Sequence, residues 1–285
     1  MEDTVVIEGQ TFSLVRVQRG GDTAVYRGDG VYLRLGNPVK IKESLARHQQ
    51  MLRSGFPVAE VKSEGEFGDQ YYFIEDSLGD QRFGGEIFNQ EVVGSGQISD
   101  ETFARFLEIT KRYAEAQIAT TTNEKNIPEF AEGIHLGVMC DELPGLADAL
   151  QARFKQATDR LADFPFAFTH GDFNPHNLYP NGVIDFEDSF QGPIGYDIVT
   201  NLFHPENFAV GSEYEYVSGY QFTEDQKQLY RDTFDSLYVE HNLPAISKVW
   251  EDLAFCRALW SASNMQAWPH LQRFRYDLIK SRFLS

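Results

Sequence analysis

A segment from Phe166 to Asp197 is rich in Gly, Pro, Asn and Asp and interrupts an otherwise helical stretch of the sequence. Asp172 follows one short apolar piece, Asn177 comes five residues later, and Asp185 lies within a second apolar piece. Carboxylate and amide oxygens on short loops are hard donors that suit Mg²⁺, which keeps several waters and takes few protein ligands. We therefore expect this segment to hold a magnesium ion.

The same residue types suit phosphoryl transfer, which asks for little covalent chemistry from a protein. The phosphates must be held, their charge must be neutralised by metal, and the attacking hydroxyl must be oriented and its proton accepted. In protein kinases the catalytic-loop Asp comes five residues before a metal-binding Asn, which is the spacing of Asp172 and Asn177. A His-Gly-Asp tripeptide alone is usually a turn, so the interpretation depends on the whole pattern.

Three ordered blocks carry a family resemblance: HGD-x4-N at 170–177, IDFE at 184–187 and GPIGYDI at 192–198. Together they resemble the signature of the aminoglycoside phosphotransferase and choline kinase superfamily. The resemblance implies an α+β, two-lobed protein-kinase-like fold, with a small β-rich N-terminal lobe and a larger, mostly helical C-terminal lobe. It implies an ATP-dependent enzyme that moves the γ-phosphate to a hydroxyl of a small molecule.

The resemblance also assigns roles within these blocks. Asp172 becomes the catalytic base, Asn177 and Asp185 become Mg²⁺ ligands, and Asp197 becomes a buried acceptor that braces the catalytic loop. Asp197 could also be the N-cap of a following helix. We expect His170 to be structural and to donate to the backbone.

Residues near these blocks have simpler explanations as well. His176 could face the substrate or simply pack against its neighbours. Glu187 and Asp188 could add charge near the metal or reach a cationic substrate, and a solvated surface explains Asp188 equally well.

The hydrophobic pattern predicts the elements that position these residues. In the N-terminal part we expect one helix, 41–53, and five strands: 11–18, 23–27, 31–35, 58–63 and 70–75. The remainder is mostly helical, with one helix capped by Ser99 and others over 141–162, 224–241, 245–265 and 271–284. Two short strands are expected at 166–168 and 183–186. We expect a nucleotide-binding lobe over 1–76 and a catalytic and acceptor-binding lobe over 77–285.

A phosphate cradle is expected between the first two strands, at Gly20, Gly21 and Thr23. Glycines let backbone amides approach phosphate oxygens, and Thr23 can add its hydroxyl. An ordinary hairpin turn explains the same residues. No Gly-Lys-Ser/Thr motif is present, so this is not a Walker loop.

Arg34 lies where the family places a Lys on the nucleotide phosphates, and Arg can bind phosphate bidentately. The family's ion-pairing Glu would fall at His48, so the partner of Arg34 is open, with Glu43 as an alternative in another register. By resemblance to the interlobe hinge, the backbone at Glu75 and Ser77 is the expected adenine site.

Composition narrows the class further. The formal net charge is −18 and no basic cluster exists, which argues against nucleic-acid binding. The acidity could draw a cationic acceptor into a cleft, although a solubilising acidic surface is the simpler explanation. No apolar run is long enough to span a membrane, and no signal peptide is evident. Two distant cysteines fit a reducing cytoplasm, which is the expected location.

We expect a small-molecule kinase that uses ATP and Mg²⁺. The alternative is a degenerate kinase that binds nucleotide as a regulatory module, suggested by Arg34 and His48. The spacing argues against a protein kinase, because only six residues separate Asp185 from the Gly192-Pro193 turn, which leaves no room for an activation segment. The acceptor stays open among aminoglycosides, amino alcohols, sugars, amino sugars and similar metabolites, and the oligomeric state and the choice of ATP or GTP are unassigned.

Overall fold

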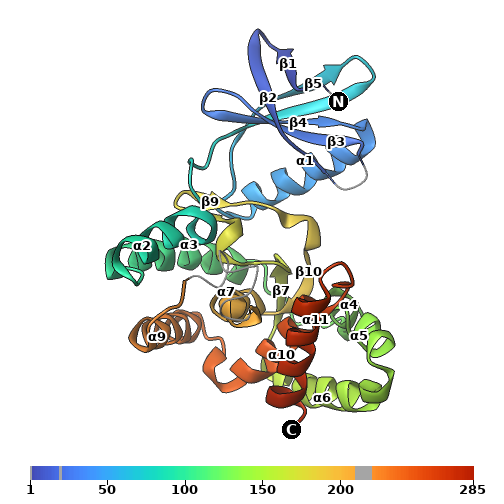
Figure 1. Ribbon diagram of the computed structural model, residues 1–285, viewed down its shortest axis with the longest axis vertical. Coiled ribbons are helices and arrows are strands. Elements are labelled where there is room, and N and C mark those ends of the chain that lie inside the picture. Colours follow the sequence, from blue (N-terminus) through green and yellow to red (C-terminus); the bar gives the residue numbers. More distant parts are fainter. Residues whose placement is uncertain (1, 19–20, 209–219) are drawn as a thin grey trace. The chain divides into compact units, whose positions relative to one another are not determined.

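The computed structural model describes residues 2–18, 21–208 and 220–285 (Figure 1). The chain forms two compact units. One comprises Met1–Asp80 with Asn181–Val183, and the other comprises Gln81–Pro180 with Ile184–Ser285. Across the described residues, no helix combines the length and apolar character needed to cross a bilayer.

The N-terminal unit is built on a six-stranded antiparallel sheet with strand order β1-β2-β3-β4-β6-β5 (Figure 1). Its elements are β1 (Thr4–Ile7), β2 (Gln10–Val17), β3 (Thr23–Arg27), β4 (Val31–Gly36), the helix α1 (Pro38–Arg53), β5 (Val61–Phe67) and β6 (Gln70–Asp76). The unit also includes the short β9 (Gly182–Val183), whose Val183 N donates to Pro57 O at 2.7 Å.

Alternation along the two central strands separates the faces of this sheet. One face contributes alternate residues of β4 and β6 to a large apolar cluster: Leu33, Leu35, Tyr72 and Ile74. On the opposite face Phe73 packs with Ile41 and Leu45 of α1. Neighbours on a strand point to opposite faces, and the cross-strand partner of Arg34 is Phe73. Arg34 therefore lies on the face that α1 covers.

The expected strands and helix of this unit are all present, with three corrections. The strand β1 was missed; it joins β2 through Glu8 and Gly9, which both have positive φ (53° and 78°), as a tight type I′-like hairpin turn requires. The helix starts three residues earlier than expected, because Asn37 accepts from Val39 N and Lys40 N and caps it. The strand β5 starts at Val61 instead of Val58.

The C-terminal unit is mostly helical. Its helices are α2 (Phe88–Ser95), α3 (Asp100–Ile118), α4 (Ile127–Gly133), α5 (Leu136–Glu142), α6 (Ala147–Arg160), α7 (Tyr196–Phe203), α9 (Glu224–Glu240), α10 (Trp250–Ala262) and α11 (Pro269–Leu278). Its strands are β7 (Phe166–Thr169), β8 (Leu178–Tyr179) and β10 (Phe190–Pro193), and β7 pairs with β10 in antiparallel register.

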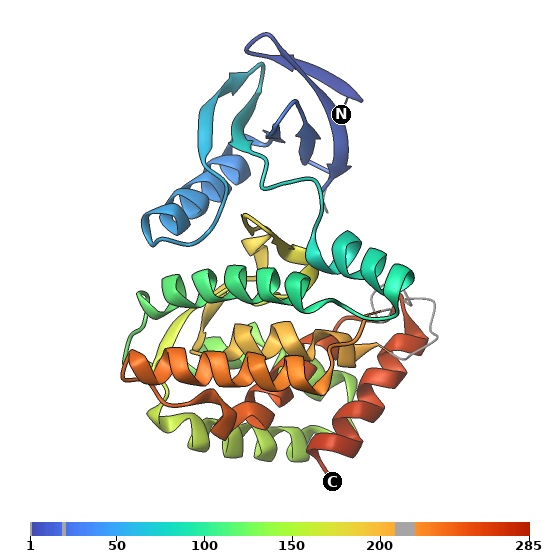
Figure 2. The same cartoon turned by 90° about the vertical axis from the view of Figure 1, so that its left-hand side faces the viewer.

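Helix α7 is the centre of this unit, and all eight of its residues are buried. Tyr113 of α3 donates to Asp197 at 2.7 Å, and Tyr230 of α9 donates to Ile198 O at 2.9 Å. Figure 2 shows α3 and α9 running alongside α7. Contacts from α3 and α9 therefore fix the first turn of α7 next to the loop that follows β7.

Several expectations for this unit hold and three fail. Ser99 caps α3, as predicted, by accepting from Thr102 N. The helix expected over 141–162 is broken at Pro144, which cannot continue the hydrogen-bond ladder. The second apolar strand ends at Val183, because Asp185 has φ of 72° and leaves the extended region. The N-cap of α7 is Gly195, and Asp197 lies inside the helix.

Candidate active site

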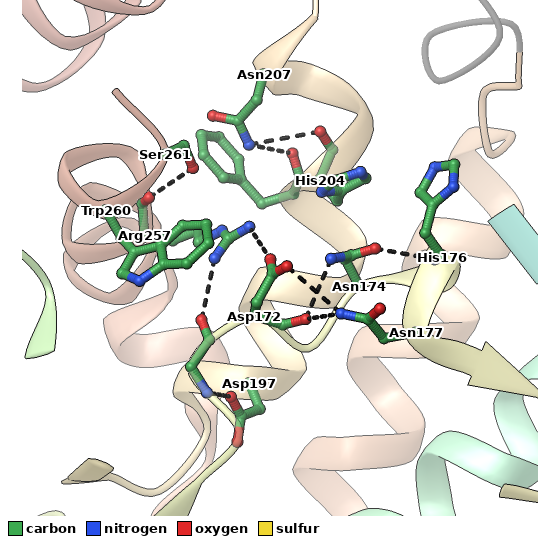
Figure 3. A network of polar contacts seen from close by, with 12 residues as sticks. Asp172, Asn174, His176, Asn177, Asp197, His204, Asn207, Arg257, Trp260 and Ser261 are labelled. Atoms are coloured by element: carbon green, nitrogen blue, oxygen red, sulfur yellow. Dashed lines mark hydrogen bonds and ion pairs between the residues drawn. The ribbon is translucent and has the colours of Figure 1, made fainter. Parts of the chain in front are cut away.

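The loop after β7 is anchored by the backbone carbonyl of Asp172 (Figure 3). Asn174 Nδ2 and Asn177 Nδ2 donate to this oxygen at 3.1 and 2.9 Å. Asn174 Oδ1 accepts from His176 N at 2.9 Å, which forms a local turn. Asn177 Nδ2 also lies 3.4 Å from Asp172 Oδ2. The loop thus closes on itself and brings the predicted base beside a predicted metal ligand.

Arg257 of α10 contacts Asp172 directly and was missed by sequence reasoning (Figure 3). Its Nη2 donates to Asp172 Oδ1 at 2.7 Å, and its Nη1 donates to Gly171 O at 3.0 Å. The Arg257 side chain is 2% exposed, whereas that of Asp172 is 26% exposed. The only signal in the sequence is an Arg inside the apolar run LAFCRALW, since a buried Arg is rare unless it is paired.

Asp197 is fully buried and braces the start of the catalytic loop. Its carboxylate accepts from His170 N at 2.9 Å and Gly171 N at 3.3 Å. It also accepts from Tyr113 and Gln117 of α3, each at 2.7 Å. Burial raises the pKa of this carboxyl, and the hydrogen bonds to its charged form oppose that rise. The bracing role implied by the resemblance is confirmed by these contacts.

Gly171 meets two requirements that exclude other residues. Its φ is 81°, and a Cβ at this position would lie 2.1 Å from Asp188 O. Only glycine tolerates both the left-handed backbone and the close approach. The glycine of the His-Gly-Asp block therefore lets the loop turn sharply between the contacts to Asp197 and the exposed end of Asp172.

Asp185 is positioned through the residue before it. His170 Nε2 donates to Ile184 O at 2.8 Å, and Ile184 N donates to Asn177 O at 3.0 Å. These bonds tie the segment to both ends of the catalytic loop and confirm the structural role predicted for His170. Asp185 itself has left-handed φ, which Asp adopts more readily than most residues but at some cost. Such strain is common where a side chain must be aimed at a functional site.

The charges around this loop fit a divalent cation. Asp188 carries a raised pKa, first because of incomplete hydration and then because of the negative charges of Asp172 and Asp185. Asn177 turns its amide nitrogen toward Asp172, which leaves Oδ1 as an acceptor on the other side. No group of three or more His, Cys, Asp or Glu in the described ranges is arranged to hold a metal.

Two imidazoles lie close together next to the catalytic loop (Figure 3). The rings of His176 and His204 are 5.4 Å apart, and Tyr220 lies 6.3 Å from His176. Burial, followed by the charge of Arg82, lowers the pKa of His176 to about 4. His176 is therefore neutral near pH 7, and it packs against other aromatic rings.

In the N-terminal unit, Arg34 has a partner that neither alternative predicted. Arg34 Nε donates to Glu75 Oε1 at 2.9 Å, and both side chains are largely buried. His48 Nδ1 lies 3.5 Å from Glu75 Oε2, while its Nε2 donates to Ala59 O at 2.5 Å. Glu43 is exposed on α1. The acid beside Arg34 therefore comes from the neighbouring strand β6.

The structure locates only some of the other residues expected at the nucleotide site. Gly20 lies outside the described residues. Gly21 has φ of 76° and donates to Gln18 O at 3.0 Å, and Thr23 Oγ1 donates to Gln18 Oε1. Ser77 N donates to Gly30 O at 2.9 Å, so this donor of the expected adenine site already has a partner. Arg34, Glu75, Thr23 and Ser77 belong to the N-terminal unit, whereas Asp172, Asn177 and Asp185 come together in the C-terminal unit.

The structure also locates only some of the residues expected near the phosphate acceptor. The acids Glu213 and Glu215, which supported a cationic acceptor, lie outside the described residues, as do Tyr214 and Tyr216. Trp260 lies beside Arg257, whose guanidinium carbon is 4.1 Å from the ring centroid.

We expect Arg34→Met to raise the KM for ATP strongly, whereas Arg34→Lys keeps much of the activity. A chain of net charge −18 that holds ATP needs a local cation, and Met would remove one while leaving the buried Glu75 carboxylate beside His48. Steady-state kinetics and the melting temperature measure the two effects separately. Glu75→Gln is the control, because it breaks the pair but keeps the cation. Unchanged ATP affinity in Arg34→Met would move the role to Arg19, Lys40 or Lys42.

Comparison with known proteins agrees with this site. A model of the phosphotransferase enzyme family (APH) matches residues 13–230, which is well over half of the chain. This protein therefore belongs to that family, and the resemblance seen in the three sequence blocks is confirmed. The α+β, protein-kinase-like fold class is confirmed as well, with one unit formed by a sheet and one helix and the other mostly helical.

Individual relatives are more distant. The N-acetylmuramate/N-acetylglucosamine kinase of Pseudomonas aeruginosa is 39% identical over 79 residues, which are 25% of this chain and 22% of that protein. The chain thus spans about a fifth of the length of this curated relative. Among solved structures, an aminoglycoside-3'-phosphotransferase of type VIII is 17% identical, with coverage of 87% and 94% and a TM-score of 0.44. A choline/ethanolamine kinase family protein from Mesorhizobium loti is 14% identical, with coverage of 94% and 92% and a TM-score of 0.42.

Proposed function

We propose that this protein is a small-molecule kinase that transfers the γ-phosphate of ATP to a hydroxyl group. The observation that carries the proposal is the closed loop of Asp172 and Asn177, tied through Ile184 to Asp185, in a chain of the phosphotransferase family. A binding module would need no partly exposed carboxylate held at the end of such a rigid loop.

Asp172 is the proposed base. Its Oδ1 is held by Arg257, so Oδ2 is the oxygen that would accept the proton of the attacking hydroxyl. In the reaction the hydroxyl oxygen forms a bond to the γ-phosphorus, the bond from that phosphorus to the β–γ bridging oxygen breaks, and ADP leaves. Such proton transfer to a positioned carboxylate typically contributes 10² to 10⁴-fold in rate.

Asn177 Oδ1 and Asp185 would hold Mg²⁺, which neutralises charge on the ATP phosphates when bound. Burial raises the pKa of Asp188 first, and the negative charges of Asp172 and Asp185 raise it further; a divalent ion here would relieve the repulsion among these carboxylates. Arg34 is the proposed cation for the phosphates, and the backbone near Glu75 and Ser77 is the proposed adenine site. The proposed lobes are residues 1–76 and 77–285.

A degenerate, nucleotide-binding module remains the second candidate, and one observation weakens it. This candidate was suggested by Arg34, where the family has a Lys, and by His48, where the family has the ion-pairing Glu. Since Glu75 forms that ion pair, the N-terminal unit keeps a charge pair of the kind an active kinase needs. Slow MgATP hydrolysis that disappears in Asp172→Ala would exclude a degenerate kinase that only binds nucleotide.

The acceptor is proposed to be a sugar, amino sugar, aminoglycoside or amino alcohol. The decisive experiment is a panel of N-acetylglucosamine, N-acetylmuramate, glucosamine, streptomycin, choline and ethanolamine with MgATP. We expect at least one compound to stimulate ADP release and to gain one phosphate by mass spectrometry. Failure of every hydroxylated compound, together with no basal hydrolysis, would contradict the kinase assignment.

The same panel tests whether the acceptor is cationic. Glucosamine and N-acetylglucosamine differ in charge at the same ring position, so kcat/KM for the two can be compared at low and high salt. Attraction by an acidic site would favour glucosamine and fade as salt screens it over a Debye length of about 8 Å. A salt-independent preference for the acetylated sugar would end the cationic proposal.

A further inference from the structure

The guanidinium of Arg257 makes three contacts, one of which is the bond to Asp172. Its Nη1 donates to Gly171 O at 3.0 Å, its Nη2 donates to Asp172 Oδ1 at 2.7 Å, and its carbon lies 4.1 Å from the Trp260 ring centroid (Figure 3). The Trp260 ring is in turn nearly parallel to that of His135, at 6.0 Å and 14°. His135 Nδ1 lies 2.7 Å from Ser263 Oγ. A continuous set of contacts thus positions the guanidinium.

Burial of Arg257 fixes the geometry of its ion pair with Asp172. Arg257 is 2% exposed, so its cation lies where water cannot replace Asp172 as a partner. A planar guanidinium that bonds a carbonyl and a carboxylate of adjacent residues fixes their relative orientation, which a point charge does not do. Asp172 Oδ1 is thus engaged by Arg257, while Oδ2 lies 3.4 Å from Asn177 Nδ2 and the side chain as a whole is 26% exposed.

We propose that Arg257 is a positioning residue for the catalytic base. It holds Asp172 in one rotamer, so that Oδ2 faces the acceptor hydroxyl. This inference rests on the proposed function of Asp172. Arg257 itself is too buried to contact an acceptor, so its contribution passes through the carboxylate and through the loop at Gly171. A small misplacement of a catalytic group can cost about 10²-fold in rate.

The first test is Arg257→Met with Arg153→Met as its matched control. Arg153 is also a largely buried arginine, paired with Asp252 at 2.8 Å and placed over the Phe255 ring at 4.9 Å. Removing it disturbs the same unit without touching Asp172. We expect Arg257→Met to lower kcat by roughly 10 to 10²-fold at nearly constant KM for MgATP. Arg153→Met should lower the melting temperature and leave kcat near that of the native protein.

A double-mutant cycle separates positioning from general destabilisation. If Arg257 acts through Asp172, the substitution Arg257→Met should change kcat less than about threefold in an Asp172→Asn background. Arg257→Lys restores the positive charge but not the planar guanidinium with its two donors. Its kcat should therefore stay about threefold to tenfold below that of the native protein. Equal losses in both backgrounds, or a kcat equal to that of Arg153→Met, would overturn the proposal.

Two further measurements keep the proposal testable if Arg257→Met does not fold or if its kinetics are ambiguous. If Arg257→Met does not fold, Arg257→Lys and Trp260→Leu carry the test, since the second removes only the stacked ring and should also lower kcat. Crystal structures of the variants need no acceptor: Asp172 should leave its rotamer or become mobile. An unmoved carboxylate would refute the positioning role while the kinase assignment stands. A native protein that transfers no phosphate would refute the kinase assignment instead.

Discussion

Asp172→Asn is expected to lower kcat by roughly 10² to 10⁴-fold with little change in nucleotide affinity. The amide keeps the size of the side chain and an oxygen that can accept from Arg257, so the loop should stay in place. What is lost is the ability to accept a proton from the attacking hydroxyl. Because Asp172 has no predicted contact with the nucleotide, the KM for ATP should stay nearly constant.

The experiment needs the phosphorylated product to be measured directly, because traces of contaminating ATPase would hide a large loss. Asp159→Asn is the control, since Asp159 is an exposed carboxylate that pairs with Lys155 on α6. The control should retain full turnover and stability. Near-native turnover in Asp172→Asn would exclude this residue as the base.

The second large effect is expected at the metal ligands. Metal ions at a phosphoryl centre contribute several kcal/mol of transition-state stabilisation, so loss of one ligand should cost about 10²-fold or more in kcat/KM. Asp185→Ala should be worse than Asn177→Ala, because it removes a full charge from the ion. Both variants should bind MgATP more weakly in calorimetry and should need more Mg²⁺ for half-maximal rate.

Backbone conformation complicates Asp185→Ala, since Ala is strained at the φ of 72° found there. Asp185→Asn supplies the control, because Asn tolerates the left-handed region as Asp does. A similar loss in the Asn and Ala variants would point to the metal, and a loss confined to Ala would point to the backbone. If both Asn177→Ala and Asp185→Ala bound MgATP normally and excess Mg²⁺ rescued neither, the two residues would not be metal ligands.

Local sequence determined most of the elements. The strands β2, β3, β4 and β6 were predictable from short β-rich runs separated by Gly-Asp turns, and α3 was predictable from Ser99 and the apolar stripe behind it. Helix breaks were less visible, because Pro144 ends one helix and the next begins within a few residues. The strand β1 was hidden because Glu8-Gly9 is a less typical type I′ turn than Asn-Gly.

Some features of the site were likewise predictable from the sequence, and others were seen only in the structure. The family and the spacing of Asp172, Asn177 and Asp185 were readable from the motifs, because residues that act together lie close along the chain. The partners of these residues came from the folded structure: Arg257, from 85 residues away, bonds Asp172, and Glu75 bonds Arg34. Ion pairs between distant segments follow from which helix and strand faces meet, and neither periodicity nor spacing along the chain records that.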